Sequence, residues 1–272
     1  VKASGTIYIR AGGSIGPPTA PIQRDSMSVF SAPPPTVWNQ TYGDTYEDAA
    51  YSVVQTSDGG YALAGSTSLI PEASDVWLVK TDVFGNMQWN KTYLGGLGHA
   101  GAYSVVQTSD GGYALAGYKV LPGHYDKDFW LIKTNSSGNM MWNKTYGGAT
   151  DDEAYSVIQT VEDEGYGYLL AGYTKSFAVG KDDVWLVKTY ANGTMQWNQT
   201  YGGTESEWAS SVVQPSDGGY VFAGSIERLG FGYDFLLYKI DSSGNFKWKT
   251  ACGTAYDEFA LSMIPTRDGG YA

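Results

Sequence analysis

The chain has 272 residues, with 17 Lys and Arg against 28 Asp and Glu, so its formal net charge is −11. Apolar residues make up 42% of the chain and charged residues 17%, which excludes an intrinsically disordered polyelectrolyte. No apolar stretch approaches the roughly 20 residues of a membrane-spanning helix. An acidic chain without a Lys/Arg cluster is also a poor partner for nucleic acid, which binds through cationic contacts. We therefore expect a soluble globular protein with no nucleic-acid partner and no membrane-spanning segment.

Residues 1–36 form an N-terminal extension ahead of the repeats. Within it, Thr6–Arg10 has the β-branched and aromatic character of a strand, and a Gly-rich turn follows. Ser14 stands in a Gly-x-Ser-x-Gly pattern, but a nucleophile of that kind must open a helix, and Pro17 and Pro18 follow instead. We therefore expect no nucleophile at Ser14, and a role for the extension in ring closure or in contacts between subunits.

Residues 37–272 contain near-copies of one unit. Each copy has a Trp, then an Asp-Gly-Gly-Tyr turn or a variant of it, then a run similar to Asp75–Lys80. The tryptophans are Trp38, Trp89, Trp142, Trp197 and Trp248, which are 51, 53, 55 and 51 residues apart. A period of this length, with the markers in constant order, indicates a repeated structural unit.

Each unit resolves into four short apolar runs, which in the first unit are Ser52–Thr56, Tyr61–Gly65, Asp75–Thr81 and Met87–Tyr93. Asp-Gly-Gly joins the first pair, and hairpin turns of this type need a positive φ that Gly adopts without a steric clash. A short connection containing Gly joins the last pair. We therefore expect each unit to be a four-stranded antiparallel meander.

The burial pattern of these strands favours an all-β propeller. Ala62–Ala64 and Val76–Val79 are apolar at consecutive positions, so both faces of these strands must be covered. The fourth run alternates in polarity, as a partly wet outer strand does. Four-stranded blades stacked around an axis satisfy this pattern. A parallel β-helix needs a shorter repeat of about 20–25 residues, and a linear array of small domains would leave each unit too little core; both rank lower.

The markers also predict the number of blades. From Trp38 onward the chain supplies an outer strand, four complete sets of four strands, and Ser262–Ala272, which covers only the first two strands of a fifth set. We expect a five-bladed ring in which Val37–Gly43 supplies the outer strand of the last blade and Thr6–Arg10 its third strand. The alternatives are an open blade that takes a strand from a neighbouring molecule, and a longer repeat array.

The residues from Ala50 to Gly65, together with Asp75–Lys80, resemble the repeat of secreted prokaryotic β-propeller proteins, which are frequent in archaea. The resemblance covers residues 38–272; it implies the architecture and is nearly silent on activity. Gly5–Arg10 with Pro17–Ile22 resembles the mature N-terminus of archaeal surface proteins. Together these resemblances imply an extracellular or cell-surface location.

Six asparagines stand in Asn-X-Ser/Thr sequons, which accept N-linked glycans at exposed sites of secreted proteins. They are Asn39, Asn90, Asn135, Asn143, Asn192 and Asn198. Four of them occupy the same position of the repeated unit, so they do not count as four independent occurrences of the motif. Two interpretations stay open: a glycan acceptor, and an exposed polar pair on the outer strand.

Groups that could carry catalysis are few. The two histidines, His99 and His124, lie in predicted loops without a partner that the sequence can place nearby. Cys252 falls in a predicted strand, where we expect a buried small apolar residue. We therefore expect no enzyme activity and no cofactor.

Acidic residues recur at two places in the unit. Pairs precede the first strand at Glu47–Asp48, Asp151–Asp152, Glu205 with Glu207, and Asp257–Glu258. A Ca²⁺ site needs about six to eight converging oxygens, so we expect a solvated rim and leave the question of a metal open. A second set begins the third strand, at Asp75, Asp128, Asp183 and Asp234, where we expect bonds to local backbone N–H groups.

Most aromatic residues are expected in the core, but five that the repeat does not share fall in or beside loops. They are Tyr46, Tyr125, Trp208, Phe231 and Tyr233. An exposed ring can stack on the face of a sugar, and Trp208 is the leading candidate for such a contact. The sequence thus favours an extracellular structural or adhesive propeller, the subunit of a surface layer or filament that associates with itself or with other surface proteins. The alternative is a lectin-like propeller with a carbohydrate partner.

Overall fold

The structure is a computed structural model that describes residues 38–43, 46–70, 73–95, 98–121, 123, 125–162, 165–230, 232–266 and 268–272. These residues form sixteen strands in four four-stranded antiparallel sheets, and none of them is helical. The predicted all-β meander is therefore confirmed. The predicted strand Thr6–Arg10, the rest of the extension 1–36, and Val37 lie outside the described residues.

Each sheet, called a blade here, consists of four strands in chain order. Blade 1 contains β1 (Asp48–Gln55), β2 (Tyr61–Ile70), β3 (Ala73–Thr81) and β4 (Met87–Tyr93). Blade 2 contains β5 (Ala100–Gln107), β6 (Tyr113–Val120), β7 (Lys127–Thr134) and β8 (Met140–Tyr146). Blade 3 contains β9 (Asp152–Glu162), β10 (Gly165–Thr174), β11 (Asp183–Tyr190) and β12 (Met195–Tyr201). Blade 4 contains β13 (Glu207–Val213), β14 (Tyr220–Arg228), β15 (Gly232–Ile240) and β16 (Phe246–Cys252).

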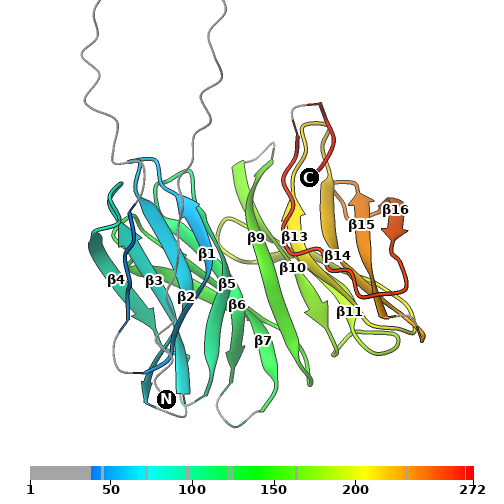
Figure 1. The fold of residues 1–272 in the computed structure, drawn as a ribbon, viewed down its shortest axis with the longest axis horizontal. Coiled ribbons are helices and arrows are strands. Elements are labelled where there is room, and N and C mark those ends of the chain that lie inside the picture. The colour runs from blue at the N-terminus through cyan, green and yellow to red at the C-terminus, as the bar shows by residue number, and fades with distance from the viewer. Residues whose placement is uncertain are drawn as a thin grey trace, which may run out of the picture.

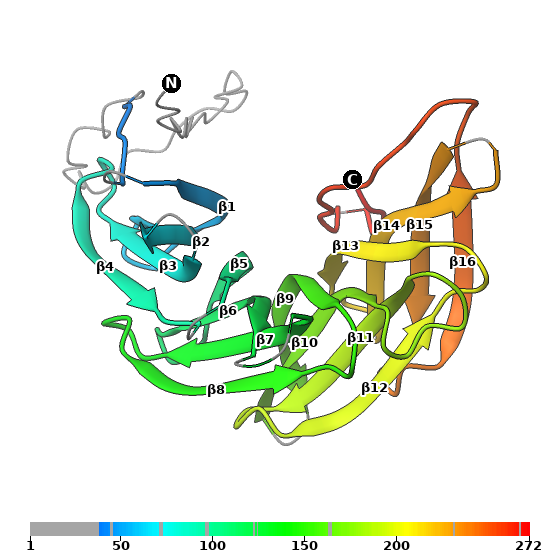
Figure 2. The ribbon, with the colours of Figure 1, turned by 90° about the horizontal axis from the view of Figure 1, so that it is seen from below.

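The four blades follow one another around an open arc (Figures 1 and 2). Their first strands, β1, β5, β9 and β13, line the concave side, and their last strands, β4, β8, β12 and β16, form the convex side (Figure 2). This is the propeller-like arrangement that the repeat predicts, with the chain running outward through each blade before it passes to the next.

Neighbouring blades bury their apolar faces against each other. One cluster joins Leu78 of blade 1 to Ile132 of blade 2, and equivalent clusters join blade 2 to blade 3 and blade 3 to blade 4. Leu78 is 0% exposed and Ile132 is 1% exposed, so the middle strands are sealed on both faces. Burying this apolar area, at about 25 cal/mol per Å², is the main favourable contribution that holds the blades together.

A serine on each first strand adds a polar contact across every junction. Its hydroxyl accepts a hydrogen bond from a backbone N–H of the following unit: Val105 to Ser52 (3.2 Å), Val157 to Ser104 (3.1 Å), Val212 to Ser156 (3.2 Å) and Met263 to Ser211 (3.1 Å). Met263 lies after blade 4, so the C-terminal segment makes the contact that the first strand of a further blade would make.

The two sequence markers of the unit meet in space. The ammonium group of the buried Lys80 lies 2.8 Å from Asp58 in the Asp-Gly-Gly turn. Blades 2 and 4 have the same pair, Lys133 with Asp110 (2.7 Å) and Lys239 with Asp217 (2.6 Å). The hydrogen bond from Lys80 is the main reason that the pKa of Asp58 falls to about 2. The turn and the third strand are therefore linked by charge as well as by backbone pairing.

The expectation of five blades is wrong, because the described residues form four complete sheets. Ser262–Ala272 was predicted to begin a fifth, and among its described residues only Pro265 and Tyr271 form a β-bridge. The physical reason is that no described strand lies beside this segment on its outer side, so it cannot extend into a sheet.

Residues 38–43 pack on blade 1 as the outer strand of a preceding blade would, but the predicted ring closure fails because the described C-terminal segment does not lie beside them (Figure 2). The Tyr42 hydroxyl donates a hydrogen bond to the Gly85 carbonyl (2.5 Å), and Tyr93 of β4 makes the same bond to Gly138 of blade 2 (2.7 Å). Residues 38–43 thus take the place of an outer strand ahead of blade 1. The C-terminal segment lies at the other end of the arc, which stays open (Figure 2).

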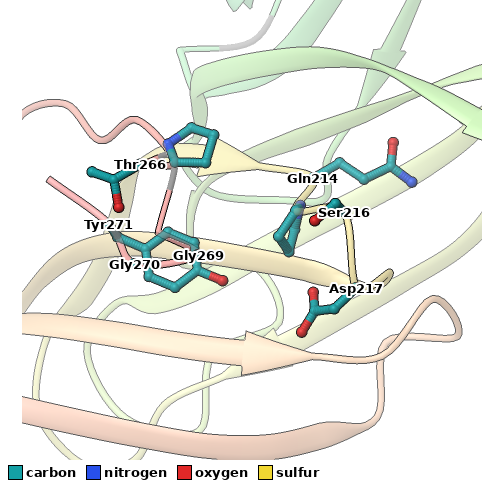
Figure 3. Close-up of a pocket in the computed structure, with 9 residues that line it drawn as sticks. Gln214, Ser216, Asp217, Thr266, Gly269, Gly270 and Tyr271 are labelled. Atoms are coloured by element: carbon teal, nitrogen blue, oxygen red, sulfur yellow. The ribbon is translucent and has the colours of Figure 1, made fainter.

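A pocket of about 350 Å³ lies between the Gln214–Asp217 turn and the turn ending at Tyr271 (Figure 3). At the three preceding junctions a Gln of the following blade accepts a hydrogen bond at this place: Gln107 from Ser57 (2.8 Å), Gln159 from Ser109 (2.8 Å) and Gln214 from Val161 (3.2 Å). In this column Pro265 takes the position of the Gln and offers no side-chain amide. The pocket thus opens at the place where the other junctions have this amide.

We predict that Pro265→Gln partly fills this pocket by accepting a hydrogen bond from the Ser216 N–H. The free energy of unfolding should rise by about 0.5–1.5 kcal/mol, the net value of one such bond, as measured by urea unfolding. Pro265→Ala removes the ring without adding an amide and is the matched control. An equal change in both variants would contradict the assignment.

Candidate functional site on the interblade face

The candidate site lies at one end of the blades. Because each blade is an antiparallel meander, the loops after the second strands and the connections between blades leave the sheets at the same end. We call this end the interblade face. Four of the five predicted rings, those of Tyr46, Tyr125, Trp208 and Tyr233, belong to this end, and Phe231 lies outside the described residues.

The four described rings differ in their exposure. Tyr125 is 99% exposed and Tyr46 is 46% exposed. Trp208 instead packs against Tyr233, with ring centroids 4.9 Å apart, and against Phe259, at 6.2 Å. The leading candidate from the sequence thus contacts its neighbours at a blade junction, and Tyr125 is the most exposed of the four rings.

Tyr125 borders a shallow pocket of about 480 Å³ between blades 2 and 3, which we call the blade 2/3 pocket. Its lining comes from the β6–β7 loop, the connection between the two blades, and the residue after β10. The lining residues are Gly123, Tyr125, Asp126, Ala149, Thr150, Asp151 and Lys175. The pocket therefore combines an aromatic ring with carboxylates, a hydroxyl and an ammonium group.

Glu153, at the start of β9, is a buried carboxylate close to this pocket. Its Oε1 accepts hydrogen bonds from Lys127 Nζ (2.8 Å) and from the Tyr173 hydroxyl (2.9 Å). Its Oε2 accepts from the Tyr103 hydroxyl (3.1 Å). Three donors, one of them charged, offset the cost of burying a carboxylate. We call these four residues the Glu153 network.

The protonation of the Glu153 network follows from its surroundings. Burial, and then the Glu153 charge, raise the pKa of Tyr103 and of Tyr173, so both stay neutral donors. Burial acts to lower the pKa of Lys127, but the hydrogen bond and charge of Glu153 outweigh it, and the pKa is raised. The Glu153 carboxyl is thus surrounded by two neutral donors and one ammonium donor in a fixed arrangement.

Asp151 connects this network to the pocket. Its Oδ1 accepts a hydrogen bond from the Lys127 backbone N–H (3.1 Å), and its Oδ2 lies 3.3 Å from Lys175 Nζ. Lys127 Nζ also lies 4.5 Å from the centre of the Tyr118 ring, a distance typical of cation–π contacts. The polar lining of the pocket is therefore held by groups beneath it.

The sequence interpretation did not single out Glu153, Lys127 or Lys175. The signal that could have found them is departure from the repeat. Glu153 stands in the column occupied by Ala49, Gly101, Trp208 and Phe259 in the other units, and Lys127 in that of Ser74, Asp182 and Tyr233. These departures gather at one junction, which a comparison of the units would have shown.

Two of the acidic residues ahead of the first strands are less solvated than predicted, whereas Glu47 and Asp257 are exposed. Asp152 is 0% exposed and Glu207 is 6% exposed. Each accepts a hydrogen bond from the connection between blades, Asp152 from Gly148 N (2.9 Å) and Glu207 from Gly203 N (3.4 Å), because this connection folds back over them. Within the described ranges, no three His, Cys, Asp or Glu side chains are placed to hold a metal ion.

Among the aspartates at the start of the third strands, Asp183 bonds local backbone as predicted, accepting from Val179 N (2.9 Å). Asp75 instead accepts from Gly95 N in the interblade connection (2.8 Å), and Asp234 pairs with Arg228 (3.0 Å). Asp183 also acts on Glu207 across the junction of blades 3 and 4. Burial, with the charge of Asp183 as a further cause, raises the pKa of Glu207 to about 7.

The prediction of a buried thiol is wrong, because Cys252 is exposed. It ends β16, whose seven residues are all exposed, because no described blade follows blade 4. The residues in the same position of β4 and β8, Tyr93 and Tyr146, are buried against the next blade. His99 lies 3.4 Å from the Ser74 hydroxyl through its Nδ1 and has no further described partner in a catalytic arrangement. His124 lies outside the described residues.

All six sequon asparagines are exposed. On the outer strands the amide oxygen accepts a hydrogen bond from a buried indole: Asn90 from Trp77 (3.4 Å), Asn143 from Trp130 (3.0 Å) and Asn198 from Trp185 (3.2 Å). Asn135 and Asn192 accept backbone N–H groups in turns. A glycan would attach to Nδ2, so it leaves the oxygen free to keep its bond.

The comparisons with known proteins add a fold likeness at low similarity. No protein-family model and no curated protein matches the chain. Sqt1 from Chaetomium thermophilum aligns at 10% identity and a TM-score of 0.40, over 82% of this chain and 66% of that one. A xylan β-1,4-xylosidase from Bacillus halodurans aligns at 14% identity and a TM-score of 0.40, over 81% of this chain and 47% of that one. The described residues include no helix that could cross a membrane.

We predict that the sequon at Asn143 has separable structural and glycan roles. Asn143→Ala should lower the free energy of unfolding by about 1–2 kcal/mol, because the Trp130 indole loses its acceptor. Thr145→Ala, the matched control, destroys the sequon but keeps that bond, so its stability should stay unchanged. After expression in an N-glycosylating host, mass spectrometry should find a glycan at Asn143 in the wild type and in neither variant. Equal destabilisation of both variants would contradict this.

The raised pKa of Glu207 predicts a specific pH dependence. The carboxyl favours its neutral form in the fold, so its contribution to the free energy of unfolding should fall as the pH rises from about 4.5 to about 7. The slope is at most about 1.4 kcal/mol per pH unit. Glu207→Gln should remove this slope in urea unfolding measured across pH, and Glu205→Gln, at the more exposed acid nearby, should keep it. An unchanged slope in Glu207→Gln would sink the interpretation.

Proposed function

We propose that the chain is a non-catalytic structural or adhesive module at the cell surface, the subunit of an assembly or filament built through its blade faces. The observation that carries this proposal is the end face of blade 1. Val53 is 50% exposed there, whereas the residues in the same column of the later blades are sealed by the preceding blade: Val105 (6%), Val157 (4%) and Val212 (2%). Blade 1 thus leaves its face uncovered around Val53 on the concave side, while Tyr42 packs against Leu63 and Val79 farther along the same face.

The other end of the arc presents the complementary side. Ile264 is 62% exposed. It corresponds in the repeat to Val54, which packs into the cluster between blades 1 and 2. The face bearing Ile264 on one molecule can therefore pack on the face bearing Val53 on another, as the facing sides of consecutive blades pack. Their contact is heterologous, and such contacts generate rings or open filaments.

The extracellular location rests on a separate observation. The sequons occupy exposed positions on outer strands and turns, where an attached glycan meets no neighbouring blade. This placement is what a secreted glycoprotein requires.

We predict that the protein associates with itself as concentration rises, through the end faces. In sedimentation velocity the wild-type chain should shift to larger species, and Val53→Asp should remove the shift, because a carboxylate cannot be buried in an apolar contact without a partner. Val179→Asp is the matched control, since Val179 is 80% exposed in a loop outside this face. A wild-type chain that stays monomeric at every concentration would refute assembly through these faces.

A second candidate is a lectin-like propeller, and the interblade face favours it. Tyr46 and Tyr125 keep exposed rings there, and Tyr125 adjoins a pocket with polar lining. Saccharide binding by the monomer, at concentrations where no larger species forms, separates this function from assembly.

A further inference from the structure

We propose that the blade 2/3 pocket is a saccharide site that takes a neutral pyranose, with Tyr125 as its stacking platform and Asp151 and Lys175 as its hydroxyl-binding pair. The proposal rests on the second candidate function and gives it a location and a ligand class. The pocket volume of about 480 Å³ falls in the range of small-molecule sites, about 300–1,000 Å³.

Tyr125 supplies the apolar part of the recognition. At 99% exposure its ring gains nothing from burial in the fold, in contrast to Trp208, which is packed at another junction. The C–H face of a pyranose can cover such a ring, and the phenolic hydroxyl stays in water. Tyr125 is therefore placed to bind a flat, partly apolar ligand at the rim of the pocket.

Asp151, Lys175 and Thr150 supply the polar part. Two carboxylate oxygens accept hydrogen bonds from adjacent hydroxyls, and an ammonium group donates to a third oxygen. Lys175 already lies 3.3 Å from Asp151, so a ligand with both donors and acceptors can insert between them without leaving an unpaired charge. A polyol has this dual character at every carbon.

The charge of the lining selects a neutral sugar over an acidic one. Asp126 and Asp151 against Lys175 give the pocket a net charge of about −1 at neutral pH. The whole chain carries a net charge of −11, which adds to the repulsion of an anion. A uronic acid would therefore bind more weakly than the neutral sugar of the same configuration.

The Glu153 network acts as the positioning layer. Glu153 fixes Lys127, whose backbone N–H in turn holds Asp151 at 3.1 Å. It also fixes Tyr173, whose ring centre lies 5.8 Å from Lys175 Nζ. Both members of the hydroxyl-binding pair are thus oriented before a ligand arrives, which lowers the entropic cost of binding.

The test uses the whole chain and defined probes. Saturation-transfer NMR and calorimetry should detect at least one of the methyl pyranosides of glucose, galactose and mannose with the wild type, and glucuronic acid should bind less well than methyl glucoside. Tyr125→Ala should weaken the bound sugar at least tenfold, and Asp151→Asn should weaken it similarly. Tyr256→Ala is the matched control, because Tyr256 is 79% exposed at a different interblade connection.

Circular dichroism and thermal unfolding of the variants check that each one folds. If the wild type binds a sugar but neither Tyr125→Ala nor Asp151→Asn changes the affinity, the pocket assignment is wrong and the lectin-like function stands. If the wild type binds none of the neutral probes, the lectin-like function fails together with the site. A preference for glucuronic acid would overturn the assignment of a neutral ligand.

Discussion

The burial of both faces of every blade is the constraint on which this structure depends. A strand such as β7, whose residues from Asp128 to Thr134 are all buried, leaves no face for water, so its sheet must lie between two others. No blade can satisfy this alone, and stability therefore accumulates through the contacts between neighbours, as in other repeat proteins. The same constraint makes the ends of the arc special, because there Val53 and Ile264 meet no further blade.

The sequence predicted the interior of the array well because every internal unit has the same surroundings. The Asp-Gly-Gly turns, the four-strand meander and the wet outer strand all follow from local chemistry, and Asp58 pairs with Lys80 in the way that these repeated markers allow. The ends were predicted poorly for the converse reason. The pattern around Pro265 resembles that of an internal unit, yet a strand forms only where a neighbouring strand is present, and none is described there. Cys252 is exposed for a related reason, since no described blade follows its strand to cover it.

The blade 2/3 pocket could not be predicted from the sequence, for a different reason. The Glu153 network beneath it joins residues far apart along the chain: Tyr103 and Glu153 are separated by 50 residues. A pairwise contact of this kind depends on the stacking of whole blades, which local patterns do not specify. The aromatic candidates show the same limit. Tyr125 and Trp208 are alike as loop-side rings in the sequence, and only the packing of Tyr233 and Phe259 against Trp208 distinguishes them.

Energetics gives a reason to interpret the Glu153 network as functional rather than structural. The junction of blades 1 and 2 has Gly101 in this column and is still well packed, so the fold does not require a carboxylate there. A buried ion pair is on average no more stabilising than apolar residues of similar volume, because desolvation offsets the Coulomb attraction. The pair of Lys127 and Glu153 thus stabilises the fold little more than apolar residues at the same positions would. What they do add is a fixed orientation for Asp151 and Lys175 at one junction, and orientation is the property that a binding site needs.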